Sequence, residues 1–129
     1  MPVIKILEQD VDAQETIVEI TTSLCETAPV SQVSLRAFCH MASLPVVSSK
    51  ISLFGFLVNN IVSEDALQMP QKTNRGYFSY RLFARVLDTK KRYVQIGDIN
   101  IELDCPLPKD IPDNSYISFD VNRLDLQSE

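Results

Sequence analysis

One histidine, His40, follows Cys39 directly, and these two side chains are the first candidates for nucleophilic catalysis. A thiol and an imidazole act as a pair only within hydrogen-bond reach, and adjacent residues of a strand point to opposite sides. We therefore expect a buried thiol and a surface imidazole. A structural zinc site needs four ligands in closely spaced pairs, which the sequence lacks, so no metal is predicted.

The sequence also lacks a glycine-rich loop that could hold phosphates. It contains three glycines, all far apart, so no phosphate-binding loop or dinucleotide motif can be assembled. Two groups of carboxylates could form an acid–base pair: Asp98, Glu102 and Asp104, or Asp110 and Asp113. We expect them in turns and on strand exteriors, where carboxylates are usually solvated. The sequence thus predicts neither catalytic residues nor a cofactor, and we do not expect an enzyme.

A cluster of basic and aromatic residues is the strongest candidate site. Residues 72–92 contain seven basic residues and one acid, although the whole chain carries a net charge of −5. Nucleic-acid bases stack on aromatic rings for about 1 to 3 kcal/mol each, while lysine and arginine neutralise phosphates. The cluster therefore predicts a surface for single-stranded nucleic acid, formed by Lys72, Arg75, Tyr77, Arg81, Phe83, Arg85, Lys90, Lys91 and Arg92.

The same cluster also has a purely structural interpretation. Tyr77 and Phe83 could pack beneath a helix or loop. The arginines could be solvated, or could pair with the acidic segment 1–30, which contains six acidic residues and one lysine.

A second candidate surface consists of apolar residues in segments expected to be exposed. Such residues often dock a partner subunit. The predicted partner-binding residues are Phe38, Met41, Ile61, Val62, Leu67 and Met69.

The elements that position these residues are mainly strands. Between Tyr77 and Asp88 every second residue from Phe78 to Val86 is apolar, and Arg81 and Arg85 lie between them. Side chains of a strand alternate between two faces, so this segment predicts one core face and one basic, aromatic face.

Further strands are predicted over residues 3–7, 16–24, 49–58, 93–103 and 115–121. Gly55 should bend its strand, and residues 88–91 should form a turn. The alternation of apolar residues shifts by one position at Gly97-Asp98. This shift indicates either a bulge or a two-residue hairpin that pairs Ile96 with Ile99. The alternation shifts again at Asn122-Arg123.

Two segments are less regular. Residues 31–44 fit both a strand and a helical stripe, and because Ser31 could cap a helix that Pro45 ends, we expect a short helix there. Residues 59–76 are polar and contain Pro70, so we expect a long loop.

The composition is typical of an intracellular globular domain. The three cysteines are widely spaced and odd in number, which suits a reducing compartment. Residues 1–12 do not resemble a secretory signal, and the longest apolar run, 53–58, is far shorter than the ~20 residues that span a bilayer. We expect one domain with acidic N-terminal strands in residues 1–30 and no contact with a membrane.

The glycine-bent strand Lys50–Val58, followed by the strands at 77–88, 92–103 and 114–124, resembles the strand order of an OB-fold. The resemblance covers residues 48–126 and extends to the small accessory subunits of replication protein A and of telomere-capping complexes. It implies a small OB-like β-barrel, here with additional N-terminal strands and one or two short helices. It also implies a nuclear protein that assembles with larger subunits and helps to hold single-stranded DNA.

The sequence therefore predicts a noncatalytic OB-like subunit of a genome-maintenance or telomere-capping complex. It would bind a larger protein partner and single-stranded DNA, without a small-molecule cofactor. The alternative is a structural or adaptor β-domain that binds proteins only.

Overall fold

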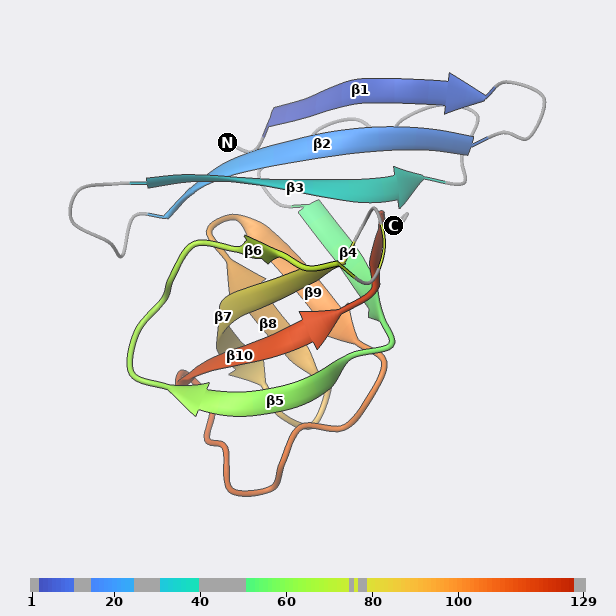
Figure 1. The fold of residues 1–129 in the computed structure, drawn as a ribbon. Helices are drawn as coiled ribbons and strands as arrows, with labels where there is room; N and C mark the ends of the chain where they lie inside the picture. Colours follow the sequence, from blue (N-terminus) through green and yellow to red (C-terminus); the bar gives the residue numbers. More distant parts are fainter. Residues whose placement is uncertain are drawn as a thin grey trace.

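The fold is built from β-strands. The structure, a computed structural model, describes residues 3–10, 15–24, 31–39, 51–74, 76 and 79–126, and these contain eleven strands and no helix (Figure 1). A mainly β fold is thus confirmed. The strands are β1 (Val3–Asp10), β2 (Glu15–Leu24), β3 (Ser31–Cys39), β4 (Ile51–Phe56), β5 (Asn59–Glu64), β6 (Gln71–Lys72), β7 (Tyr80–Asp88), β8 (Tyr93–Ile96), β9 (Ile99–Leu103), β10 (Tyr116–Val121) and β11 (Arg123–Leu126).

The strands belong to one sheet with two ends. Its order is β1-β2-β3-β11-β4-β9-β8-β7-β10-β5, and the short β6 pairs beside β7. Among the residues that the structure describes, hydrogen bonding runs from β1 to β5 without returning, so these strands do not form a closed barrel.

The part of the sheet from β11 to β5 curls around a core. β5 follows β4 after Leu57 and Val58, and β11 follows β10 after Asn122. These two bent segments run antiparallel, because β4 pairs with β11 and β5 pairs with β10. β9 lies parallel to β4 on its other edge, and β8 and β7 continue the sheet to β10.

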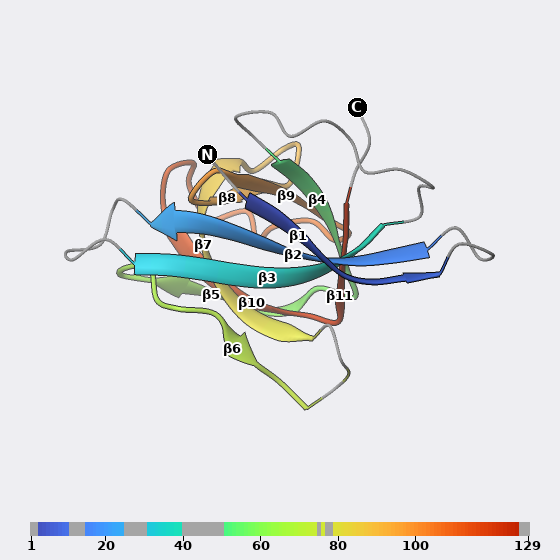
Figure 2. The same ribbon diagram turned by 90° about the horizontal axis from the view of Figure 1, so that it is seen from above.

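β1, β2 and β3 form an antiparallel layer across the curled part (Figures 1 and 2). Alternate residues of β2 and β3, such as Ile20 and Leu35, are fully buried and belong to the core. β11 links this layer to the rest of the sheet, since Asp125 pairs with Phe38 of β3 while Leu124 pairs with Gly55 of β4.

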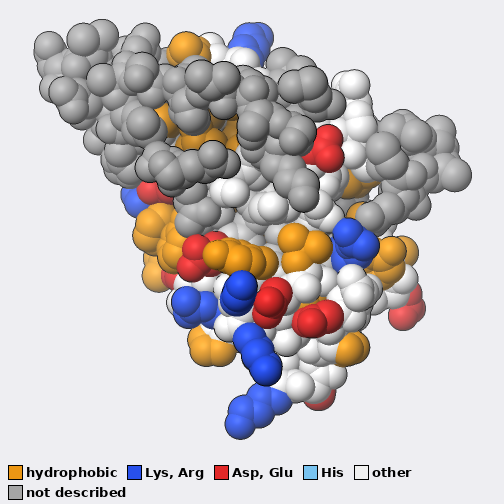
Figure 3. All heavy atoms as spheres, turned by 180° about the vertical axis from the view of Figure 1, so that it is seen from behind, with side chains coloured by type: hydrophobic (Ala, Val, Ile, Leu, Met, Phe, Trp, Pro, Cys, Tyr) orange, Lys and Arg blue, Asp and Glu red, His pale blue; other side chains and the backbone are white. Residues whose placement is uncertain are grey.

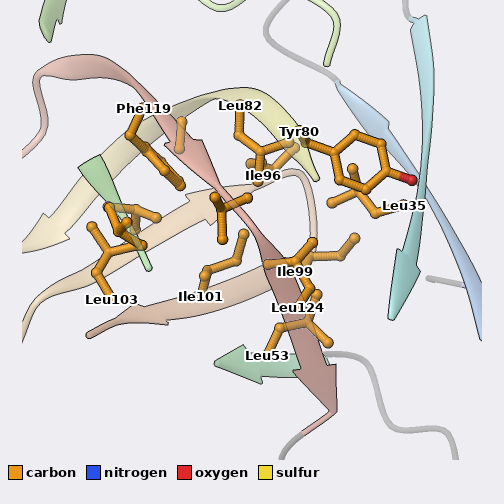
Figure 4. Close-up of a cluster of buried hydrophobic side chains, with 14 of the residues drawn as sticks. Leu35, Leu53, Tyr80, Leu82, Ile96, Ile99, Ile101, Leu103, Phe119 and Leu124 are labelled. Atoms are coloured by element: carbon orange, nitrogen blue, oxygen red, sulfur yellow. The ribbon is translucent and has the colours of Figure 1, made fainter. Parts of the chain in front are cut away.

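The core lies inside the curled part and extends to the layer above it. Figure 4 shows side chains from most strands converging there, with the Tyr80 ring directed towards β3. The face of β7 predicted to be apolar is buried at Tyr80, Leu82, Ala84 and Val86, as expected, while Phe78 lies outside the described residues. Core side chains labelled in Figure 4 include Leu53, Ile96, Ile99, Ile101, Leu103, Phe119 and Leu124.

The predicted short helix is wrong over residues 31–39, which form β3. β3 pairs with β2 along its whole length. Its alternate residues are all buried, namely Val33, Leu35, Ala37 and Cys39. Pairing with a neighbouring strand therefore overrides the helix-forming tendency of this segment. Residues 40–44 lie outside the described part of the chain.

The predicted loop over residues 59–76 is also partly wrong, because it contains β5 and β6. The bend predicted at Gly55 falls at Leu57 instead, where the backbone adopts a positive φ of 55°. β4 runs straight through Gly55, whose missing side chain leaves room for Val121: a Cβ there would lie 3.3 Å from it.

Two predicted irregularities are confirmed. Gly97 and Asp98 form a two-residue hairpin loop in which Ile96 pairs with Ile99, and the slip at Asn122 separates β10 from β11.

Candidate binding surfaces

Arg81 lies on the predicted basic side of β7, but its guanidinium is engaged by neighbouring strands. Nη1 donates to Asp120 Oδ1 at 3.0 Å and to the Asn60 carbonyl at 3.2 Å, and Nη2 donates to Ser118 Oγ at 2.8 Å. Asn60 Nδ2 also donates to Asp120, and Ser118 Oγ donates to Glu64 Oε1. Arg81 thus fastens β10 and β5 to β7.

Phe83 and Arg85 follow on the same side of β7. The Phe83 ring is only 7% exposed, so it presents no free face for stacking. Arg85 is half-buried, and its Nη2 donates to Gln95 Oε1 of β8 at 2.7 Å. Both side chains are integrated into the outer surface of the sheet.

Lys72 stabilises the loop between β6 and β7. Its ammonium donates to the carbonyls of Thr73, at 2.9 Å, and Gly76, and it lies 5.8 Å from the centre of the Tyr80 ring. The predicted residues Arg75 and Tyr77 lie in the same stretch but outside the described residues.

Lys90, Lys91 and Arg92 form the turn between β7 and β8. Lys90 and Lys91 are exposed, and the backbone N–H groups of both donate to Asp88 Oδ1. Beside them Tyr93 is 38% exposed. The turn therefore presents cations next to an accessible ring, with a carboxylate at its base.

The described members of the predicted nucleic-acid set are spread along the length of β7. Arg81 and Asp88 are seven positions apart on β7, or roughly 23 Å at the rise of an extended strand. The end of β7 near Lys72 and Arg81 therefore lies far from the turn that contains Lys90. Figure 3 shows lysine and arginine side chains interleaved with acidic and hydrophobic ones on the face seen from behind.

The predicted partner-binding residues divide into exposed and half-buried groups. Val62 and Met69 are each 47% exposed, whereas Ile61 and Leu67 are half-buried and pack against the core. Phe38 lies on β3, not on a helix, and is half-buried beneath Arg123, whose guanidinium lies 5.7 Å from the centre of the ring. Met41 lies outside the described residues.

Leu57 is the most exposed large hydrophobic side chain in the described residues, at 63%, and it was not predicted as part of a site. The Asp104 carboxylate fixes its backbone by accepting from the N–H groups of Leu57, at 2.6 Å, and Val58, at 3.0 Å. The sequence gives little indication of this, because Leu57 continues an apolar run that is otherwise buried at Leu53 and Gly55.

The thiols show no catalytic arrangement in the described residues. Cys39 is buried, and Cys105 is half-buried with its Sγ donating to the Val58 carbonyl at 3.6 Å. Burial, and secondarily the charge of Asp104, raise the pKa of the Cys105 thiol, while Arg92 opposes this shift. The described residues include no cluster of histidine, cysteine, aspartate and glutamate that could hold a metal ion.

Among the residues the structure describes, no helix has the length and hydropathy to cross a bilayer. No protein-family model, curated protein or solved structure matches this chain.

Proposed function

We propose that this chain is a noncatalytic, OB-like binding subunit that docks a larger protein partner through the 57–69 surface. This surface is defined by the exposed side chains of Leu57, Val62 and Met69. A role in a genome-maintenance or telomere-capping complex belongs to the same proposal and is supported only by the resemblance of residues 48–126 to OB-fold strand order.

Leu57 carries the proposal. Its φ of 55° is a left-handed conformation that costs an ordinary residue about 1 to 2 kcal/mol, and asparagine or glycine usually occupies it. Its side chain is also 63% exposed, so it gains little from packing within this chain. Since neither backbone nor core favours a leucine here, a contact outside the chain is the best explanation for it.

The distribution of exposed apolar side chains supports the same surface. Large hydrophobic residues are exposed at five positions in the described part of the chain, and three of them lie between residues 57 and 69; the others are Ile6 and Tyr93. Burying one aliphatic side chain of this kind against a partner contributes about 1.5 to 3 kcal/mol.

The variant Leu57→Asn tests the proposal. It removes the apolar side chain and suits the left-handed backbone, so the chain should be as stable as the wild type or slightly more stable. A stoichiometric partner that copurifies with the wild type should be lost. Ile6→Asn, at a 48% exposed position on β1, is the control and should retain it. Partner recovery unchanged in Leu57→Asn would refute the assignment of this surface.

Single-stranded nucleic acid is a second candidate ligand, favoured by the exposed Tyr93 ring beside Lys90 and Lys91. Fluorescence anisotropy with a labelled oligonucleotide at two salt concentrations tests it. Replacing both lysines by alanine should weaken binding and reduce the salt slope by about 1.4, since each phosphate contact with a single strand contributes about 0.7. Binding that is absent, or unaffected by this double variant and by Tyr93→Ala, would exclude the turn.

A further inference from the structure

β5 is an edge strand that is available for pairing. It is the last strand of the sheet order, and among the described residues it pairs only with β10. The backbone groups on its other edge alternate with those bonded to β10. An edge of this kind is a template for an additional strand.

The edge is also held in place before any partner arrives. The Arg81 guanidinium donates to the Asn60 carbonyl, Asn60 donates to Asp120, and Glu64 accepts from Ser118. These bonds fasten both ends of β5 to β10 and β7. A pre-organised strand loses little conformational freedom on binding, which favours association.

The features that usually protect edge strands are missing from the regular part of β5. The irregular part of β5 is its first half. There Asn60 has a positive φ of 55°, and the pairing with β10 shifts register between Ser118 and Asp120. The following residues, Ile61–Glu64, contain no proline and no lysine, and Val62 is 47% exposed. Proline, inward or edge lysines and bulges are the common devices against unwanted pairing.

The charge around this edge indicates what kind of strand fits. Asp65 is exposed directly after β5, and Glu64 is half-buried against Ser118. The nearest cation in this network, Arg81, already bonds Asp120 at 3.0 Å. An incoming segment therefore meets one exposed apolar side chain, Val62, and an acidic end of the strand, which suits a basic residue in the segment.

We propose that the partner contributes an extended segment that adds as a strand to β5 along Ile61–Glu64. An apolar side chain of this segment contacts Val62 or Leu57, and a lysine or arginine lies beside Asp65. This inference rests on the proposed function, because it states how the partner engages the 57–69 surface.

A displayed library of random linear peptides, panned against the full chain, supplies the probe. Enriched peptides should combine alternating apolar residues with a lysine or arginine and should lack a central proline. Their affinity should fall at least tenfold for Val62→Asp and several-fold for Asp65→Lys. The control Asp110→Lys, at an exposed position in the loop before β10, should bind them like the wild type.

Amide hydrogen exchange followed by NMR separates strand addition from side-chain docking. Saturating peptide should slow exchange at alternate amides of Ile61–Glu64, those that face away from β10, by at least tenfold. No enrichment of peptides, or peptide binding without this alternating protection, overturns strand addition. Protection of the same amides without peptide, together with a dimeric mass in solution, overturns it in favour of a second copy. In each case loss of the partner in Leu57→Asn would still support the proposed function.

Discussion

The phenol oxygen of Tyr80 accepts a hydrogen bond from the backbone N–H of Arg36 at 3.1 Å, across 44 positions in sequence. Tyr80 belongs to β7 in the curled part of the sheet, and Arg36 belongs to β3 in the layer above it. The ring itself is buried in the core and only 7% exposed. One side chain thus packs in one part of the fold and satisfies a backbone donor of the other.

We predict that Tyr80→Phe destabilises the chain by about 1 to 2 kcal/mol, because it removes this acceptor while keeping the ring. Chemical denaturation should show a lower midpoint with an unchanged slope. Tyr116→Phe, at a half-buried tyrosine of β10, provides a comparison and should shift the midpoint less. Equal shifts in the two variants would argue against a link through Tyr80.

We predict a larger loss for Gly97→Ala. A Cβ at Gly97 would lie 2.7 Å from the Ser23 carbonyl and 2.7 Å from Thr22 Oγ1, and the backbone φ is +56°. The methyl group would push the β8–β9 hairpin away from β2, at a cost of about 2 kcal/mol or more. Thermal unfolding measures this as a drop in Tm. Gly76→Ala, where an added Cβ meets nothing within 4 Å, should leave Tm almost unchanged.

Replacing Arg81 should loosen β5. Arg81→Ala removes three hydrogen bonds and breaks the ion pair of Arg81 with the Asp120 carboxylate, which is 16% exposed. We expect a loss of about 1 to 3 kcal/mol and faster amide exchange in β5 than elsewhere in the sheet. Lys90→Ala, at an exposed position in the turn, should change neither. Unchanged exchange in β5 would show that Arg81 does not hold this strand.

Replacing Asp104 should lower both the stability of the chain and its binding to the partner. Asp104→Ala removes the acceptor of both the Leu57 and Val58 N–H groups, and we expect a loss of about 1 to 3 kcal/mol together with weaker partner recovery. Asp104→Asn keeps one acceptor oxygen and should lose less of both. If partner recovery stayed at the wild-type level in Asp104→Ala, the fixed position of Leu57 would be irrelevant to docking.

The Cys105 thiol should react slowly with alkylating agents. Because burial raises its pKa, it carries less thiolate at pH 8 in the folded chain than in the unfolded chain. The folded state retains this proton to higher pH, so the associated stability is present below the unfolded pKa and is lost as pH rises through the folded pKa. Mass spectrometry of alkylated peptides, with and without urea, measures the difference. Equal rates in both states at pH 8 would contradict it.

Strong alternation made the central strands predictable from sequence. The apolar row of β7, the phase shift at Gly97-Asp98 and the break at Asn122 follow from the spacing of apolar residues alone. That spacing left both a bulge and a hairpin open at Gly97-Asp98, and the structure shows the hairpin. β5 was missed because only Ile61 and Val62 are apolar within it, so an edge strand bonded on one side has no clear period of two. Residues 31–39 fit both the two-residue period of a strand and the period of a helix, and only pairing with β2 decides for the strand.

The charged side chains were harder to place than the strands. Arg81 stands in a basic stretch of sequence, yet its partner Asp120 is 39 positions away and reaches it only through the register of β7 with β10. Local charge density therefore overstated the basic character of this surface. Leu57 was missed for a related reason, because the carboxylate that accepts from its backbone N–H belongs to Asp104, 47 positions later.

β11 lies between β3 and β4 in the sheet, although both are translated well before it. Arg123 lies over the rings of Phe38 on one side and Phe56 on the other, so a late-emerging segment fills the seam between two early ones. While residues 123–126 are still inside the ribosomal exit tunnel, the nascent chain holds two facing strand edges with nothing between them. Completion of this sheet therefore waits until residues 123–126 have left the tunnel, and until then those edges are exposed to chaperones and to other nascent chains.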